Sequence, residues 1–265
     1  MTGPKVCVSL DGTTVKAMAD EAARANLAGA EFVEVRFDRL YLAKPEPVEV
    51  EDEDGEIKRI MAPENEWPVR DVGEVDVDEA IQSLKESIPL PVIFTVRPTS
   101  EGGFFPGSED ERMTILEKGI ASGVNSIDLE ISIADKARKA LIEQAASNSV
   151  SVISSIHNTT TTPSAEELVN MVNEHATEGQ IFKFCGTVND HQDALQLVEA
   201  SYELRNSKHA FAMMGLGNGG DWTRLHAPVL GQSMVYATLR SEHKLSNKGL
   251  VNVKDLKNAW TLLEY

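Results

Sequence analysis

The feature that most constrains the fold is a regular alternation of short apolar segments with longer segments of helical periodicity. Strand-like and helix-like segments alternate along all 265 residues, and most units repeat about every 25–30 residues. Strands that alternate with helices at this period form parallel sheets. Eight such units in a chain of this length predict an α/β fold of the (β/α)8 (TIM) barrel type, whose active site lies at the C-terminal ends of the strands.

The expected strands are short and rich in apolar residues. They cover residues 6–10, 31–38, 91–97, 126–130, 150–157, 179–186, 209–214 and 232–238. We expect them to build one barrel domain over residues 1–265. A doubly wound open sheet is the alternative, although no glycine-rich dinucleotide-binding fingerprint follows the first strand.

One acidic segment interrupts the repeat. Residues 41–77 contain prolines and a turn signal at 53–56, and we interpret them as a surface excursion with a hairpin across 48–50 and 57–61. The segment carries twelve Asp or Glu against four Lys or Arg, which contributes −8 to the net charge of −17. This charge argues against nucleic acid and against anionic membrane surfaces as partners.

The composition predicts a soluble protein of the cytoplasm. Hydrophobic residues make up 42% of the chain, and no apolar stretch approaches membrane-spanning length. Residues 1–10 lead directly into a strand-like segment without the pattern of a secretory signal. Cys7 and Cys185 lie far apart in expected buried strands, so we expect free thiols in a reducing compartment.

A single lysine lies within an apolar strand. Residues 179–186 are mainly apolar, and alternation places Phe182 and Phe184 on one face and Lys183 on the other. Desolvation lowers the pKa of a lysine, and a neutral amine is a nucleophile toward carbonyl groups. The alternative is a structural lysine at a sheet edge, with a packed stem and a charged head that reaches water.

Further polar side chains fall at the ends of the other expected strands. They are Glu34, Arg36, Arg97, Glu101, Asp128, Glu130, His157 and Arg224. In a barrel they converge on one mouth, where the cations suit an anionic substrate such as a carboxylate or a phosphate. We expect neighbouring guanidinium groups to depress the pKa of Lys183 further. The set offers an amine nucleophile, an imidazole for proton transfer and arginines for orientation.

These residues also have structural interpretations. Glu34 and Arg36 could form an ion pair inside the barrel, Arg97 could pair with Asp128, and His157 could bond a loop carbonyl. The histidines show no ligand spacing, so we predict no metal site.

Short segments spread over nearly the whole chain match one enzyme family in order and spacing. They are Glu34-Val35-Arg36-Phe37-Asp38, Thr95-Val96-Arg97, Glu101-Gly102-Gly103, Ile127-Asp128-Leu129-Glu130, Ser154-Ser155-Ile156-His157 with Thr162-Pro163, Phe182-Lys183, Met214-Gly215, and Thr223-Arg224 before Gly231. Through this ordered set the chain resembles the type I 3-dehydroquinate dehydratases, the Schiff-base class of the shikimate pathway.

The resemblance implies a reaction and a role for each catalytic residue. Lys183 would form an imine with the ketone of 3-dehydroquinate, and elimination of water would give 3-dehydroshikimate. His157 would act as general base and general acid, and Glu101 would orient it. Arg224 would hold the substrate carboxylate with its fork. The imine supplies the activation, so neither a cofactor nor a metal is implied.

The resemblance also assigns substrate binding and assembly. Glu34, Arg36 and Arg97 would contact the ring hydroxyls, and a homodimer is implied. The family closes its site with a loop of the pattern Ser-x-Pro-Gly-Gln, in which Ser246 matches the serine and would bind substrate. Leu250 replaces the glutamine, which removes one substrate hydrogen bond.

Two other functions fit the same residues. A class I aldolase would also use an imine on Lys183, and the glycine-rich residues 215–220 are compatible with a bound sugar phosphate. A barrel that has lost catalysis would serve as a binding protein. Retention of the lysine, histidine, glutamate and arginine set argues against that loss, and Leu250 is the departure that favours it.

Overall fold

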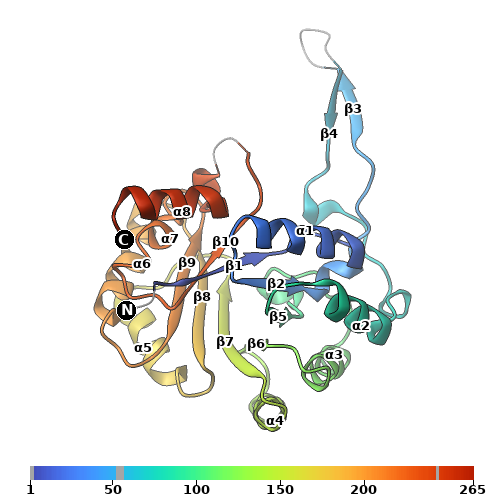
Figure 1. Ribbon diagram of the computed structural model, residues 1–265, viewed down its shortest axis with the longest axis horizontal. Coiled ribbons are helices and arrows are strands. Elements are labelled where there is room, and N and C mark those ends of the chain that lie inside the picture. The colour runs from blue at the N-terminus through green and yellow to red at the C-terminus, as the bar shows by residue number, and fades with distance from the viewer. Residues whose placement is uncertain (1–2, 52–56, 243–244) are drawn as a thin grey trace.

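The computed structural model describes residues 3–51, 57–242 and 245–265, and Figure 1 shows the course of the chain. Its main sheet consists of β1 (Lys5–Ser9), β2 (Phe32–Arg36), β5 (Val92–Thr95), β6 (Ser126–Glu130), β7 (Ser151–Asn158), β8 (Ile181–Thr187), β9 (Phe211–Leu216) and β10 (Met234–Ala237). These strands are parallel and lie in the order β10, β1, β2, β5, β6, β7, β8, β9. The sequential order confirms the (β/α)8 barrel, because a doubly wound sheet reverses its strand order at a switch point.

A glutamine side chain joins β9 to β10 where a backbone ladder is missing. The Gln232 amide accepts from Met213 N at 3.0 Å and donates to Met213 O at 3.1 Å. Just beyond it, Ser233 N donates to Phe211 O at 2.9 Å. The amide therefore satisfies backbone groups of β9, and the eight strands form a nearly closed ring.

Helices cover the outside of the barrel. They are α1 (Val15–Leu27), α2 (Val77–Ser87), α3 (Glu109–Ala121), α4 (Asp135–Ser147), α5 (Ala165–His175), α6 (His191–Leu204), α7 (Trp222–Leu225) and α8 (Val253–Leu262). Ser164 is the N-cap of α5 and forms a capping box with Glu167. In the part of the chain that the structure describes, no helix is long and apolar enough to cross a membrane.

The expected eight strand–helix units are confirmed, and the unit after β9 has the shortest α-helix. The unit after β9 contains only the four-residue α7. Pro228 follows closely, and a proline disfavours helical backbone at the residue before it. The preceding glycine-rich segment occupies the rest of this connection and returns to the barrel mouth, where it takes part in the site described below.

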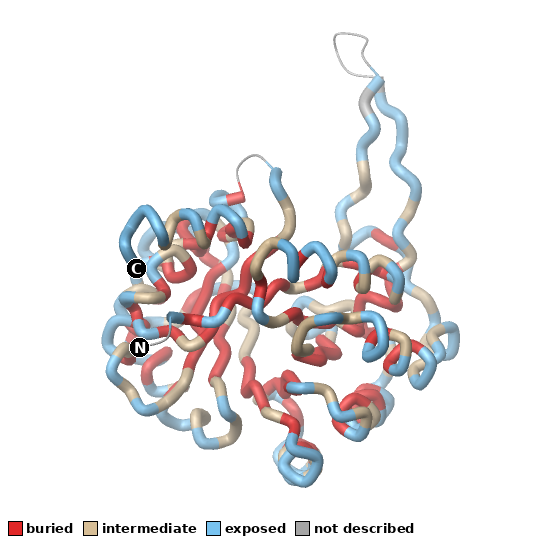
Figure 2. Tube along the Cα trace, viewed as in Figure 1, coloured by how far each residue is buried: buried red, intermediate tan, exposed pale blue. Residues whose placement is uncertain are grey.

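The core follows the period of the strands. Figure 2 shows that the strands are the most buried part of the molecule. Inside the barrel, Ile153 precedes Ser155 and His157 on β7, and Ile181 precedes Lys183 on β8. Residues two apart share a face, so apolar side chains fill the lower barrel and polar side chains lie toward the C-terminal ends of the strands.

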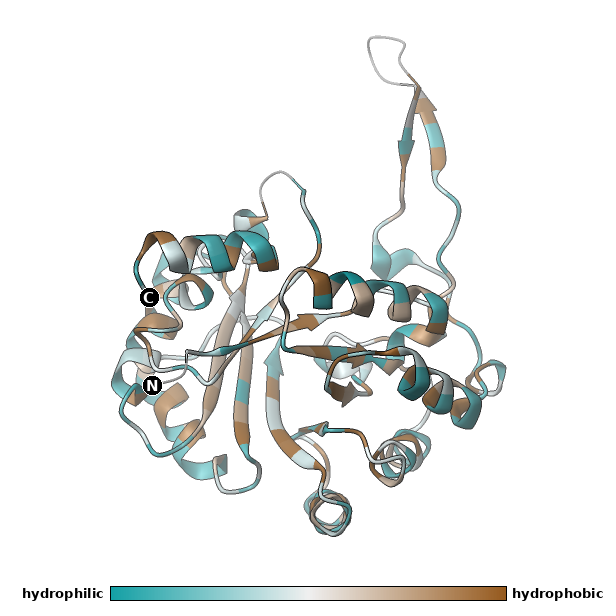
Figure 3. Cartoon of the chain, viewed as in Figure 1, coloured by the Kyte–Doolittle hydropathy of each residue, from teal (hydrophilic) through white to brown (hydrophobic). Residues whose placement is uncertain are grey.

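The acidic excursion forms a projecting hairpin, which confirms that part of the prediction. Strands β3 (Val48–Glu51) and β4 (Ile57–Ile60) pair in antiparallel fashion and stand away from the barrel (Figure 1). Both strands carry apolar and polar residues (Figure 3), and Val48 and Ile57 are 62% and 70% exposed. The predicted turn at residues 53–56 lies outside the described residues.

Candidate active site

A cavity of about 470 Å3 opens at the C-terminal ends of the strands. It is lined by seven of the eight residues predicted for the site, namely Glu34, Arg36, Arg97, Glu101, His157, Lys183 and Arg224. The eighth, Ser246, lies outside the lining, and its hydroxyl donates to Asp221 Oδ2 at 2.6 Å. Leu250 of the same loop lines the cavity instead.

Lys183 is buried on a central strand of the barrel. Its Nζ donates to Glu34 Oε1 at 2.8 Å and to Asp128 Oδ2 at 3.1 Å. The ring of Tyr236 packs against the ammonium, with its centroid 4.2 Å from Nζ. The side chain is neither at a sheet edge nor directed to solvent, so the alternative of an edge-strand lysine is wrong.

The charge state of Lys183 differs from the sequence-based expectation. Burial lowers its pKa, but the carboxylates of Asp128 and Glu34 raise it by more, and the net result is a raised pKa. The expected depression by guanidinium groups is outweighed, since Arg97 lies farther along the same network. In the free protein Lys183 is therefore an ammonium held between two carboxylates.

The two carboxylates are held in the ionised form. Burial would raise the pKa of Glu34, but Lys183, Arg36 and Arg97 together outweigh it and the pKa is lowered. Burial also opposes ionisation of Asp128, whose pKa is nevertheless lowered by Arg97 and Lys183. Ser155 supports Asp128 with a hydrogen bond of 2.5 Å to Oδ1. Neither carboxylate is a strong base while these cations are present.

The guanidinium of Arg97 forms ion pairs with carboxylates inside the barrel. Its Nη1 lies 2.5 Å from Glu130 Oε1, and its Nη2 lies 3.1 Å from Asp128 Oδ1. Glu130 is shared with Arg112, whose Nη1 donates to its second oxygen at 2.7 Å. The structural interpretation of Arg97 as a partner of Asp128 is confirmed, although Arg97 also lines the cavity.

Arg36 is held in the same way, by a residue two positions along the chain. Its Nε and Nη2 donate to the two carboxylate oxygens of Asp38 at 2.9 and 2.7 Å. Asp38 is fully buried and also accepts from the backbone N of Phe104 at 3.1 Å. Arg36 therefore reaches the cavity with a fixed orientation, and its Nη1 has no hydrogen-bond partner within the described part of the chain.

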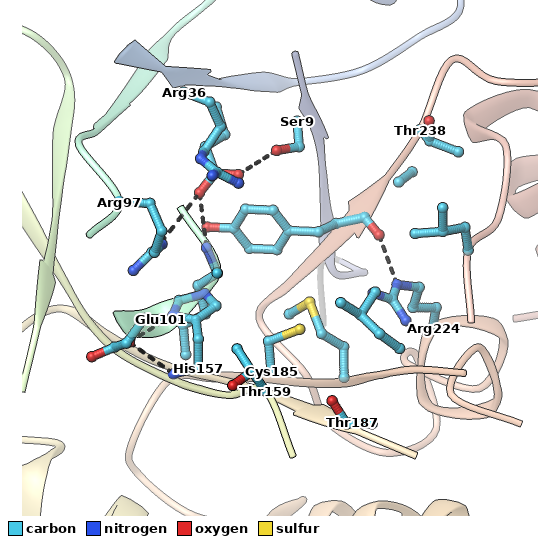
Figure 4. Close-up of a pocket in the computed structure, with 18 of the residues that line it drawn as sticks. Ser9, Arg36, Arg97, Glu101, His157, Thr159, Cys185, Thr187, Arg224 and Thr238 are labelled. Atoms are coloured by element: carbon cyan, nitrogen blue, oxygen red, sulfur yellow. Dashed lines mark hydrogen bonds and ion pairs between the residues drawn. The ribbon is translucent and has the colours of Figure 1, made fainter. Parts of the chain in front are cut away.

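His157 lies beside Glu101 on the same side of the cavity (Figure 4). Glu101 Oε2 accepts from the backbone N of His157 at 3.0 Å and lies 3.2 Å from Nδ1. We assign the proton to Nδ1, because a carboxylate accepts hydrogen bonds, and this leaves the lone pair on Nε2. Burial, Arg97 and Lys183 lower the pKa of His157 well below its usual value, so the imidazole is neutral at pH 7.

Arg224 occupies the opposite side of the cavity (Figure 4). Its Nη1 donates to the carbonyl oxygens of Gly215, Gly220 and Gly249 at 2.7, 2.8 and 2.6 Å, and its Nε donates to Tyr236 O at 2.9 Å. Among the described residues, Nη2 has no hydrogen-bond partner. The expected two-nitrogen fork is therefore not presented, and Nη2 alone is available to a ligand.

Sequence reasoning missed several residues that line the cavity or support it. Asp128 contacts Lys183 directly, whereas the sequence indicates it only as a polar strand end and a partner of Arg97. Tyr236, Asp11 and Arg240 also line the cavity or contact its residues. The signal available for Tyr236 is its inward position on the last predicted strand, and Arg240 follows that strand closely. Asp11 follows the first strand in the same way.

These features define a class of protein: a (β/α)8 barrel whose cavity holds a buried lysine between two carboxylates and a neutral histidine. The family model of the type I 3-dehydroquinases matches residues 6–265, and the chain belongs to this family.

Individual relatives agree with the family. The chain is 31% identical to the 3-dehydroquinate dehydratase of Methanosarcina barkeri over 189 residues, which cover 70% of this chain and 78% of the relative. It is 27% identical to that of Methanopyrus kandleri over 259 residues, covering 97% and 99%. The crystal structure of a type I 3-dehydroquinate dehydratase from Clostridium difficile with covalently modified comenic acid has a TM-score of 0.79 at 23% identity, covering 99% and 93%, and supports the fold.

Proposed function

We propose that the chain is a 3-dehydroquinate dehydratase of the shikimate pathway. It is a hydro-lyase that removes water from 3-dehydroquinate and releases 3-dehydroshikimate through an imine on Lys183. The observation that carries the proposal is the buried Lys183 Nζ, 2.8 and 3.1 Å from two carboxylates, in one cavity with a neutral His157. Family membership supplies the substrate.

Imine formation begins with the loss of a proton from the Lys183 ammonium. We assign this proton transfer to the lone pair on His157 Nε2, because the imidazole is neutral and Glu34 and Asp128 are held ionised by their cationic partners. The free amine attacks the ketone carbon, and the carbinolamine loses water to give a protonated imine. This cation replaces the ammonium between Glu34 and Asp128, so the carboxylates that raise the pKa of Lys183 also stabilise the electron sink.

Elimination then requires a base and an acid in turn. Nε2 of His157 removes a proton from the carbon next to the imine carbon, and the electron pair moves to the imine nitrogen as an enamine forms. The enamine expels the hydroxyl group, which leaves as water with the proton from the imidazolium. Glu101 stabilises that imidazolium through Nδ1, and hydrolysis of the conjugated imine frees the product and Lys183.

Binding of the substrate is divided between the two sides of the cavity. Arg224 Nη2 faces the substrate carboxylate, and it keeps its positive charge because its other nitrogens meet carbonyl oxygens. Arg36, Arg97 and Glu34 line the cavity near Lys183 and would contact the ring hydroxyls. Ser246 would have to leave Asp221 to reach the substrate.

The aldolase alternative is not favoured by the glycine-rich loop. A phosphate site needs backbone N–H groups that converge on the anion. Here the carbonyl oxygens of Gly215 and Gly220 converge on Arg224 Nη1, which makes this part of the loop a cradle for a cation. The non-catalytic alternative is not favoured either, because nucleophile, base and orienting carboxylate share one cavity.

We also infer a cytoplasmic homodimer. The two cysteines, Cys7 and Cys185, are free thiols, which suits a reducing compartment. The dimer is inferred from the resemblance to the family. Sedimentation velocity of the purified chain tests it, and a species of 29.0 kDa at micromolar concentration would contradict it.

The experiment that tests the function mixes the protein with 3-dehydroquinate, with and without borohydride. Absorbance of the conjugated enone reports the product, and peptide mass spectrometry locates the reduced adduct. Enone formation together with an adduct on Lys183 is the expected result. An adduct without enone would contradict the dehydratase, and turnover without an adduct on Lys183 would contradict the imine.

A further inference from the structure

We propose that Arg240 is a second guanidinium for the carboxylate of the substrate, and that Glu64 of the acidic excursion is its positioning residue. The inference rests on the proposed function, because it assigns a further contact to the same anionic substrate. It also gives the excursion, residues 41–77, a place in the active site.

Arg240 lines the cavity together with Arg224 and Leu250. It follows β10, and its backbone N donates to Thr238 Oγ1 at 3.1 Å. The guanidinium donates from Nε to Asp11 Oδ2 at 2.7 Å and from Nη2 to Glu64 Oε1 at 3.1 Å. No residue in the described ranges accepts from Nη1, so this nitrogen remains for a ligand.

A second arginine determines how Glu64 holds Arg240. Arg39 donates from Nη1 and Nη2 to the two oxygens of Glu64 at 3.0 and 3.1 Å. This fork uses both oxygens of Glu64. Oε1 also accepts the hydrogen bond from Arg240 Nη2. Partial burial would raise the pKa of Glu64, but the two arginines lower it and keep the carboxylate ionised. Glu64 thus engages one nitrogen of Arg240, and Nη1 is left free.

Asp11 connects the cluster of Arg39, Glu64 and Arg240 to the barrel. Arg39 Nε donates to the carbonyl oxygen of Asp11 at 2.9 Å. The backbone N–H groups of Asp11 and Gly12 donate to Glu21 Oε2 on α1 at 2.8 and 2.9 Å. Asp11 is therefore fixed before substrate arrives, which is what a positioning contact requires.

Residues 62–70, the part of the excursion nearest the barrel, which we call its foot, are also held by hydrogen bonds. Arg70 Nη1 donates to the carbonyl oxygens of Leu40 and Leu42 at 2.6 and 2.7 Å, and Trp67 Nε1 donates to Ala62 O at 2.7 Å. Glu64 lies within this foot, at the start of a short 3-10 helix. The hairpin projects into solvent, while the foot returns to the rim of the cavity.

The charges and the hydrogen-bond donors around Arg240 both favour the binding of a carboxylate. Arg39 and Arg240 offset the charges of Asp11 and Glu64, and Arg224 adds a cation whose hydrogen-bond partners are carbonyl groups. Leu250 contributes no donor to this part of the cavity. Arg224 Nη2 alone leaves most acceptor positions of a carboxylate unfilled, and Arg240 Nη1 fills one more.

The test compares Arg240→Gln, Glu64→Gln and their double variant in steady-state turnover of 3-dehydroquinate. We expect KM to rise about 10-fold for Arg240→Gln and about 3-fold for Glu64→Gln, with kcat within about 2-fold of wild type, because only ground-state binding is lost. The double variant should match Arg240→Gln, since Glu64 acts through Arg240. Arg59→Gln, which removes an exposed arginine paired with Glu49 on the hairpin, is the matched control.

The carboxamide of 3-dehydroquinate separates recognition from structural damage. Wild-type protein should show a higher KM for the carboxamide, and Arg240→Gln should raise the KM for the carboxylate but not for the carboxamide. An equal rise for both, or no rise for the carboxylate, would overturn the role of Arg240. A wild-type protein that turns over neither compound would overturn the proposed function and this inference together.

Discussion

The two sides of the cavity handle buried charge in different ways. On the lysine side, Lys183 and Arg97 meet Glu34 and Asp128 in one network of ion pairs. On the arginine side, Arg224 is equally buried, but carbonyl oxygens receive its hydrogen bonds. Figure 4 shows His157 and Arg97 on one side and Arg224 on the other.

The difference indicates that the lysine side suits proton transfer and the arginine side suits recognition of an anion. An ion-pair network fixes protonation states, because each charge stabilises its partner against the cost of burial. A guanidinium held by carbonyl dipoles keeps its full charge, and an incoming anion meets no competing carboxylate at that nitrogen. The lysine side therefore sets the pKa values of Lys183 and His157, while the arginine side is where we expect the anion to bind.

The largest effect is expected when the lysine side loses its nucleophile. Lys183→Met should abolish the borohydride adduct and lower kcat by at least about 10^4-fold, because imine formation is the first chemical step. The substitution also leaves Glu34 and Asp128 without their ammonium, so the protein should lose roughly 3–5 kcal/mol of unfolding free energy. Enone absorbance and urea unfolding measure the two losses, and wild-type turnover in this variant would refute the mechanism.

The next effect separates the base from the nucleophile within the same side. His157→Gln should lower kcat about 10^2- to 10^4-fold, the usual contribution of a general base, while the adduct on Lys183 still forms more slowly. Mass spectrometry after borohydride treatment checks the adduct. If adduct and turnover vanish together, His157 is essential for imine formation, and the expected separation of base from nucleophile is wrong.

A smaller effect should come from the arginine side. Arg224→Lys should raise KM about 10- to 100-fold with kcat within a few fold, because one ammonium cannot both hold the carbonyl groups and face the substrate. Arg59→Lys on the hairpin is the matched control. A fall in kcat as large as that of His157→Gln would mean that the two sides are not separate.

The sequence is sufficient to predict the fold and most members of the cavity. Period and strand length indicate the barrel, and the inward face of each strand follows from alternation alone. The same alternation correctly predicts that Glu34, His157 and Lys183 meet in one cavity, although they lie on three different strands.

The ion-pair and hydrogen-bond partners of the site residues could not be predicted in the same way. The pKa of Lys183 depends on distances to Asp128 and Glu34, which lie 55 and 149 residues away in the chain. The orientation of Arg224 depends on carbonyl groups, which every residue carries and no sequence pattern marks. Glu64 is one of twelve acidic residues in the excursion, and only the return of the foot to the barrel distinguishes it.

The smallest expected effect tests whether burial, Arg97 and Lys183 lower the pKa of His157. The pKa of His157 is lowered in the folded protein by burial, Arg97 and Lys183, whereas the unfolded chain protonates near pH 6.5. As pH falls below about 6.5, the unfolded state binds a proton that the folded state does not, so the free energy of unfolding decreases, by at most about 1.4 kcal/mol per pH unit. The carboxylates act in a different window, because their lowered pKa values cost stability only below about pH 4.

Urea unfolding between pH 7 and 5 should therefore show a slope of stability against pH that His157→Gln flattens. His191→Gln, which changes a histidine at the start of α6, should leave the slope in place and is the matched control. An unchanged slope in His157→Gln would mean that the cations of the lysine side do not control the histidine, because a folded state that binds the proton as readily as the unfolded state contributes no slope.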